Sequence, residues 1–179
     1  PMPAPIEDAY DAVPRLIDQA AALGADPARM AVLGASAGAT LAAMTAIKAG
    51  ELGLPVCAQV LINPQLDWTE RAFAYPSFSE SAGSPTASPA NCRAVRRVAL
   101  PEGFDARTVS PLSSESLAGL APALIQSAGL DPLEDQAPAY ADRLRLEGVD
   151  VTLTRYPEAT HAFLSMPGVV PSARSARAE

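Results

Sequence analysis

The 179-residue chain is long enough for one domain with a substantial core and too short for two comfortable ones. Its net charge of −7 argues against nucleic acid or an anionic membrane as a partner. Two cysteines and one histidine argue against a disulfide framework and against a metal site such as zinc. No basic-then-apolar leader opens the chain, and no apolar run reaches the roughly 18 residues of a membrane span, so we expect a cytoplasmic protein.

Hydrophobic periodicity predicts helices that alternate with short buried strands. In chain order these are a helix over 6–23, a strand over 30–33, a helix ending near 49, and strands over 56–62 and 123–127, followed by a helix over 136–146 and a strand over 151–156. Gly24 and Gly50 are the expected stops of the first two helices. This alternation predicts an α/β fold with a mostly parallel sheet and helices on both faces.

Residues 65–112 are rich in proline and serine, with one short helical stretch near Cys92–Val98. We expect an excursion over the sheet within a single domain covering residues 1–179, and a linker between domains is the alternative. Cys57 lies inside the predicted strand over 56–62, so we expect it to be a buried thiol.

The sharpest local pattern is Gly34-Ala35-Ser36-Ala37-Gly38, which has the form G-x-S-x-G. A strand is predicted before it and a helix after it, which is the setting of a nucleophile elbow. Small side chains permit the tight turn, and the turn lifts the serine hydroxyl off the sheet edge. The backbone N–H of Ala37 can then point at an oxyanion. The alternative is a helix entry of small residues that Ser36 merely caps.

A serine nucleophile needs a base, and His161 is the one histidine of the chain. Asp131 is the first polar residue after the third predicted strand, and His161 follows the fourth. In α/β-hydrolases the partners occur in the order serine, acid, histidine, each on a loop at the carboxyl end of a strand. Taken singly, a loop histidine is more often structural, and an Asp before Pro132 is a common turn cap.

These three side chains predict acyl transfer. Neutral His161 would take the proton of Ser36 during attack on an ester carbonyl, and Asp131 would hold the imidazole tautomer. Water would then attack the acyl-enzyme, and no cofactor is required. Glu134 and Asp135 are second choices for the acid, but we expect them to face solvent in the first turn of a helix.

The motifs together resemble the hormone-sensitive-lipase-like carboxylesterases, family IV of the α/β-hydrolases, over nearly the whole chain. Gly34–Ala39 is similar to the family's G-D-S-A-G-G, and Asp131–Asp135 to its D-P-L-x-D, whose first Asp is the triad acid. His161–Phe163 resembles H-G-F, with Ala in place of Gly. Val109–Leu112 resembles the family's approach to the acid loop, and Gly24–Val32 its lead-in to the elbow.

Two departures from the family pattern affect the expected activity. Ala35 stands where the family has an acidic neighbour of the nucleophile. The H-G-G-G oxyanion loop of the family is absent, so we expect an N-terminally truncated α/β-hydrolase core in which Ala37 is the one identified oxyanion donor. Since losing one donor typically costs about 10² to 10³ in turnover, we expect weak catalysis by these residues alone.

The leading hypothesis is hydrolysis of short- to medium-chain acyl esters as small-molecule substrates. The alternatives are ligand binding without turnover, since the plant gibberellin receptors resemble this family, and an inactive esterase fragment. A receptor of that kind would typically lose a triad member, and all three are present here. Trp68, Phe73 and Tyr75 are candidates for an acyl site or for core packing. The sequence leaves open whether the chain forms a homodimer.

Overall fold

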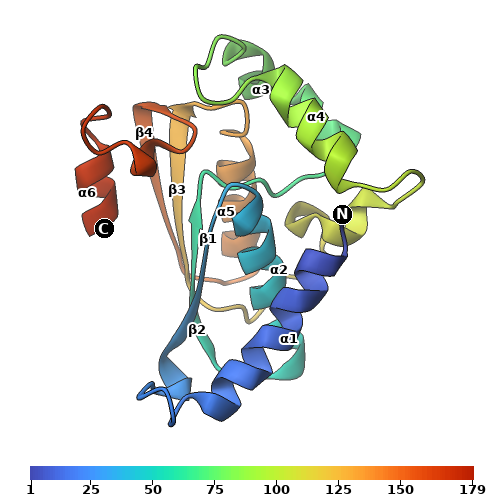
Figure 1. Ribbon diagram of the computed structural model, residues 1–179, viewed down its shortest axis with the longest axis vertical. Helices are drawn as coiled ribbons and strands as arrows, with labels where there is room; N and C mark the ends of the chain where they lie inside the picture. Colours follow the sequence, from blue (N-terminus) through green and yellow to red (C-terminus); the bar gives the residue numbers. More distant parts are fainter.

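The computed structural model describes residues 1–179, and its centre is a sheet of four strands (Figure 1). These are β1 (Met30–Ala35), β2 (Val56–Ile62), β3 (Ala123–Leu130) and β4 (Val151–Thr160). They lie side by side in chain order, and every neighbouring pair is parallel. The α/β class with a parallel sheet is therefore confirmed, and β3 and β4 run several residues further than the apolar runs predicted.

Each strand ends directly before a polar residue. These residues are Ser36, Asn63, Asp131 and His161, after β1, β2, β3 and β4 respectively. Parallel pairing places the carboxyl ends of all four strands at one edge of the sheet. The topology therefore brings four polar side chains, up to 125 positions apart in sequence, to a common edge.

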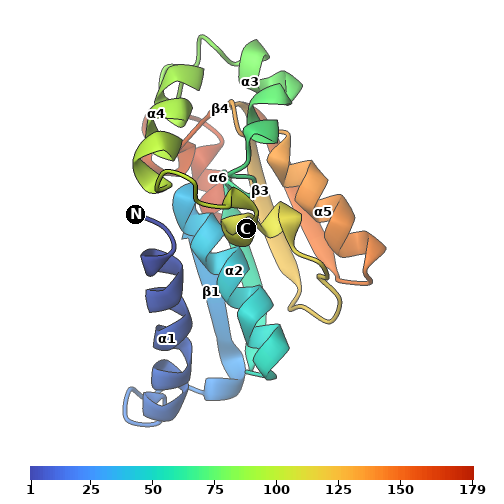
Figure 2. The ribbon, with the colours of Figure 1, turned by 90° about the vertical axis from the view of Figure 1, so that its right-hand side faces the viewer.

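Helices cover the sheet unequally on its two faces. The six helices are α1 (Ala4–Gln19), α2 (Ala37–Leu52), α3 (Pro76–Glu80), α4 (Pro89–Ala99), α5 (Gln136–Leu146) and α6 (Ala173–Ala178). Figures 1 and 2 show α1, α2 and α5 on one face, the short α6 on the other, and α3 and α4 beyond the carboxyl ends of the strands. None of these helices combines the length and the apolar character that a membrane span requires.

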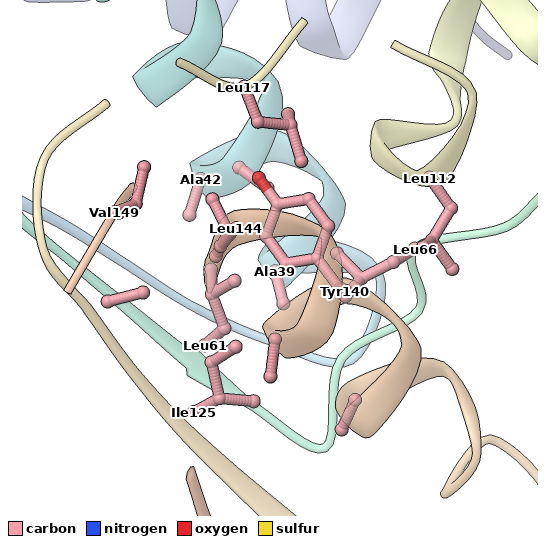
Figure 3. Close-up of a cluster of buried hydrophobic side chains, with 14 of the residues drawn as sticks. Ala39, Ala42, Leu61, Leu66, Leu112, Leu117, Ile125, Tyr140, Leu144 and Val149 are labelled. Atoms are coloured by element: carbon pink, nitrogen blue, oxygen red, sulfur yellow. The ribbon is translucent and has the colours of Figure 1, made fainter. Parts of the chain in front are cut away.

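The main hydrophobic core lies between the sheet and the pair α2 and α5 (Figure 3). Leu61 and Ile125 project from the strands, and Tyr140 and Leu144 project from α5 to meet them. The contacting face of α2 consists mostly of alanines, which let that helix approach the sheet closely. Fully burying each of the larger side chains contributes roughly 1.5–3 kcal/mol, so this layer is a main source of stability.

The second helix ends later than the expected stop at Gly50. Gly50 lies inside α2, and the helix continues to Leu52. Gly53 then adopts φ +64, the left-handed conformation that closes helices and that glycine enters without a steric cost. The prediction of Gly50 as the stop is therefore wrong by three positions.

Two residues expected in the interior are exposed. Leu33 on β1 is 68% exposed, and the Cys57 thiol on β2 is also exposed. Alternate side chains of a strand point to opposite faces, and here only one face of β1 and of the start of β2 is covered by helices (Figure 1). The α6 helix packs instead over Ala128 and Ala159, on β3 and β4.

Glu147, at the end of α5, ties that helix to the segment that leads into β3. Its carboxylate accepts hydrogen bonds from the backbone N–H of Leu117 and the hydroxyl of Ser116, and it pairs with Arg143 at 3.2 Å. These contacts, first the backbone N–H of Leu117 and then the Ser116 hydroxyl, hold the pKa of Glu147 below its ordinary value of 4.5. The ionised form is therefore favoured by folding.

We predict that Glu147→Gln lowers the unfolding temperature at pH 7 and has progressively less effect below about pH 4.5. A carboxyl whose pKa is lowered by folding stabilises above its unfolded pKa, and this contribution disappears as the pH falls through the folded pKa. Thermal unfolding of both proteins between pH 3 and 7 measures the difference. Glu115→Gln, at an exposed position in the same segment, is the control. An effect of Glu147→Gln that stays constant with pH would contradict the prediction.

Candidate active site

Ser36 occupies a strained turn between β1 and α2. Its backbone has φ +57 and ψ −124, a conformation that L-residues rarely adopt. Three backbone hydrogen bonds hold the turn. The N–H of Ser36 donates to the carbonyl of Ile62 at 2.9 Å, and the carbonyl of Ser36 accepts from the N–H groups of Ala39 at 3.0 Å and Gln65 at 3.2 Å. The predicted strand–turn–helix setting of Ser36 is present in the structure.

His161 lies between Ser36 and Asp131 and is hydrogen-bonded to both. Its Nε2 is 2.9 Å from Ser36 Oγ, and its Nδ1 is 2.6 Å from Asp131 Oδ2. An ionised carboxylate only accepts hydrogen bonds, so Nδ1 carries the proton that faces Asp131. In the neutral imidazole Nε2 is then an acceptor that points at the serine hydroxyl. This arrangement can remove a proton from Ser36.

The Asp131 carboxylate is buried and held from three directions. It is 1% exposed, and its Oδ1 accepts the backbone N–H of Leu133 at 3.0 Å. Oδ2 accepts a hydrogen bond from Asn63 Nδ2 at 3.3 Å besides its contact with His161. Asn63 was not among the residues predicted from the sequence, although its place directly after β2 matches the places of the other three residues after their strands.

Close packing of two strand ends brings the acid to the histidine. A Cβ atom on Gly129 of β3 would lie 2.5 Å from the carbonyl oxygen of Pro157 on β4, so only glycine permits this approach. After His161 the chain turns through Ala162, which has φ +60. The family motif has glycine at this position, and the left-handed turn supplies the physical reason.

The alternative acids have other partners. Glu134 pairs with Arg155 at 2.7 Å, and the carboxylate of Asp135 accepts the backbone N–H of Ser77 at 2.7 Å, at the start of α3. The expectation that both face solvent is therefore wrong, because the neighbouring strand and the segment over the sheet supply donors. Asp131 is the carboxylate that contacts His161.

Trp68 is a core residue. It is 1% exposed, its indole N–H donates to Thr40 Oγ1 at 2.9 Å, and it packs with Ile6 and Val109. Phe73 is half-buried and stacks against Phe78 at 4.9 Å between ring centroids. Of the aromatic candidates for an acyl site, the structure thus assigns Trp68 to packing.

The thiol of Cys92, on α4, is affected by the charge of Asp131. Burial first, and the negative charge of Asp131 second, raise the pKa of this thiol above its usual value. A thiol in that state is protonated at neutral pH and is a poor nucleophile. Ser36 therefore has no competing thiolate at this position.

The N–H of Ala37 is the first of α2 and has no acceptor within the helix. It lies next to Ser36 at the positive end of the helix dipole, so it can donate to an anion that forms beside the serine. No group of three or more His, Cys, Asp or Glu side chains is arranged to hold a metal ion.

A serine in a strand-to-helix elbow, followed by Asp131 and His161 at the ends of later parallel strands, is the architecture of an α/β hydrolase. Comparison with known families agrees, because residues 1–165 match the family described as alpha/beta hydrolase fold. The chain therefore belongs to this family, and the resemblance inferred from its motifs is confirmed.

Similar proteins include several esterases. Esterase LipI of Mycobacterium tuberculosis is 35% identical over 181 residues, 98% of this chain and 55% of that protein. Ethyl acetate hydrolase of Pseudomonas putida is 35% identical over 175 residues, 96% of this chain and 54% of that protein. The solved hyperthermophilic esterase from the archaeon Pyrobaculum calidifontis has a TM-score of 0.91 at 34% identity, covering 98% of this chain and 58% of that one. The chain spans about half the length of the curated relatives it matches.

The two glycines of the elbow are expected to respond differently to substitution. A Cβ on Gly34 would lie 2.1 Å from the carbonyl oxygen of Gly38, whereas a Cβ on Gly38 would meet nothing within 4 Å. We predict that Gly34→Ala destabilises the protein by about 3 kcal/mol. Gly38→Ala should be neutral or stabilising by up to about 1 kcal/mol, because alanine favours the helix. Urea unfolding compares the two, and equal effects would contradict this view of the turn.

The left-handed turn after His161 gives a further prediction. Ala162→Gly should stabilise the protein by about 1 kcal/mol, because glycine adopts φ +60 without the steric cost that alanine bears there. Ala12→Gly, at an exposed position inside α1, is the matched control and should destabilise by about 1 kcal/mol. Chemical denaturation measures both changes. Loss of stability in Ala162→Gly would show that the turn is not strained.

Proposed function

We propose that this protein is a serine carboxylesterase that hydrolyses short- to medium-chain acyl esters. The observation that carries the proposal is the hydrogen-bonded line from Ser36 Oγ through His161 to Asp131, with separations of 2.9 and 2.6 Å. A serine hydroxyl is a weak nucleophile until a neighbouring base takes its proton. The distance to Nε2 supports a transfer of that proton to the imidazole, and the burial of Asp131 supports a role for its carboxylate in stabilising the imidazolium.

In the proposed mechanism Ser36 Oγ attacks the ester carbonyl carbon while its proton moves to His161 Nε2. The N–H of Ala37 stabilises the oxyanion of the tetrahedral intermediate. The C–O bond of the ester then breaks, and the imidazolium gives its proton to the departing alcohol. Water, deprotonated by His161, attacks the resulting acyl-serine, and the carboxylic acid leaves as Ser36 regains its proton. No cofactor enters these steps.

The proposed substrate class rests on the similar proteins and on the chemistry of the site. The names ethyl acetate hydrolase and arylesterase are carried by relatives that are 35% and 30% identical to this chain. The first name indicates an ester with a small acyl group and the second an aryl ester, and both agree with the proposed substrate range. We therefore expect p-nitrophenyl acetate and butyrate to be suitable assay substrates.

A fluorophosphonate probe tests the proposed nucleophile and base. We predict that labelling disappears in Ser36→Ala and falls strongly in His161→Ala, and that Asp131→Asn lowers kcat for ester hydrolysis about 10³- to 10⁴-fold by favouring the wrong tautomer. Mass spectrometry of the labelled peptide and p-nitrophenyl butyrate hydrolysis are the measurements. Ser175→Ala, an exposed serine on α6, is the control and should behave as the wild type.

Two outcomes would contradict the proposal. Equal labelling of wild type and Ser36→Ala would place the reactive group elsewhere. A folded protein that neither reacts with the probe nor hydrolyses esters, yet binds small esters by calorimetry, would favour a binding role on the same fold.

A further inference from the structure

Asn63 occupies a backbone conformation that few residues tolerate. It is the first residue after β2, its φ is +44, and its side chain is buried at 3% exposure. Its N–H donates to the carbonyl of Gln126 on β3 at 2.8 Å, which fixes the turn against the neighbouring strand. Asparagine and glycine are the residues that enter the left-handed region most readily, so the turn alone restricts the residue type.

The side chain of Asn63 contacts the acid of the site. Its Nδ2 donates to Asp131 Oδ2 at 3.3 Å, and the same oxygen lies 2.6 Å from His161 Nδ1. Asp131 Oδ1 is occupied by the backbone N–H of Leu133, so each carboxylate oxygen has a donor from the protein. The amide can face the carboxylate only through its NH₂ group, because reversing it would set two acceptor oxygens against each other.

The oxygen of the Asn63 amide indicates that the turn alone does not explain why asparagine is found at this position. Asn63 Oδ1 is buried and has no hydrogen-bond partner. Burying an unpaired amide oxygen is unfavourable, and glycine would satisfy the turn without it. The donor that Asn63 presents to Asp131 accounts for a polar side chain at this position.

We propose that Asn63 is a positioning residue that fixes the orientation of the Asp131 carboxylate and, through it, the tautomer of His161. The Asn63 donor on Oδ2 and the Leu133 N–H on Oδ1 hold the carboxylate at both oxygens, so that Oδ2 stays against His161 Nδ1. The kinetic part of this inference rests on the proposed esterase function, whereas its structural part concerns the imidazole alone. The simpler alternative is that Asn63 only makes the turn.

The test compares Asn63→Gly and Asn63→Asp with the wild type. Glycine keeps the turn and removes the amide, and aspartate keeps the turn and the shape but replaces the donor with an acceptor. Because the chain has one histidine, ¹⁵N-labelled histidine gives the NMR signals of a single imidazole ring, and the Nδ1 proton can be followed without overlap. We expect solvent exchange of the His161 Nδ1 proton to become about tenfold faster in Asn63→Gly, the effect of one hydrogen bond to a charged group.

The kinetic measurement separates positioning from binding. In Asn63→Gly kcat for p-nitrophenyl butyrate should fall about tenfold or more while KM stays within about twofold, because only the orientation of the base changes. In Asn63→Asp a second carboxylate also lies next to Asp131, so kcat should fall at least as far wherever both carboxyls are ionised. Gln19→Glu, which adds a negative charge at an exposed site near the end of α1, controls for net charge and should match the wild type. Unfolding temperatures establish that each variant is folded.

Unchanged proton exchange and unchanged kcat in folded Asn63→Gly would overturn the proposal and leave Asn63 as a turn residue. If Asn63→Gly fails to fold, unchanged exchange in Asn63→Asp overturns it equally. If the wild type hydrolyses no ester and takes no fluorophosphonate at Ser36, the esterase function fails, and the imidazole exchange rates alone then decide the role of Asn63.

Discussion

The parallel pairing of four strands is the constraint on which the rest of the structure depends. Parallel pairing sets the carboxyl ends of β1 to β4 at one edge, and each strand ends directly before a residue that contacts another member of the site. The sheet hydrogen bonds therefore do two things at once. They bury apolar strands under α2 and α5, and they deliver a hydroxyl, an amide, a carboxylate and an imidazole to one place.

This convergence is accompanied by backbone strain at the strand ends. The three non-glycine residues with positive φ are Ser36, Asn63 and Ala162, and each lies at or next to the end of a strand. Conformations of this kind cost of order 1–3 kcal/mol each and persist only where the surrounding structure fixes them. Here hydrogen bonds to Ile62 and to Gln126 join two of these residues, Ser36 and Asn63, to the adjacent strand. The strain is thus concentrated where the polar side chains meet.

Much of this arrangement could be predicted from the sequence, for identifiable reasons. Helix and strand periods predicted the element order. The G-x-S-x-G pattern selected Ser36, and the order serine, acid, histidine at strand ends selected Asp131 and His161; the structure brings the three together. Asn63 satisfies the same rule, yet the pattern Asn-Pro also fits an ordinary turn, so its type carried no signal of chemistry. The contact with Asp131 depends on how β2 and β3 are placed, which no local pattern contains.

The errors concern properties that depend on distant parts of the fold. Leu33 and Cys57 lie in apolar runs, but their exposure is decided by which face of the sheet the helices cover. Asp135 looked like a solvated residue in a first helical turn, but Ser77, which is 58 positions away, donates to its carboxylate. Periodicity reports the local conformation of a segment, whereas these outcomes are set by the segment that packs against it.

The partners of Asp135 show that the segment over the sheet belongs to the framework of the site. Ser77 Oγ donates to the carbonyl of Pro132, and the adjacent Gln136 accepts the backbone N–H groups of Leu66 and Asp67 at 2.7 and 2.9 Å. The turn that carries Asp131 is therefore hydrogen-bonded to α3, and the start of α5 that follows it is hydrogen-bonded to the beginning of that segment. Gln65, the first residue of that segment, also donates its N–H to the carbonyl of Ser36 at 3.2 Å. A displacement of the segment would therefore act on the Asp131 carboxylate and on the turn that carries Ser36 together.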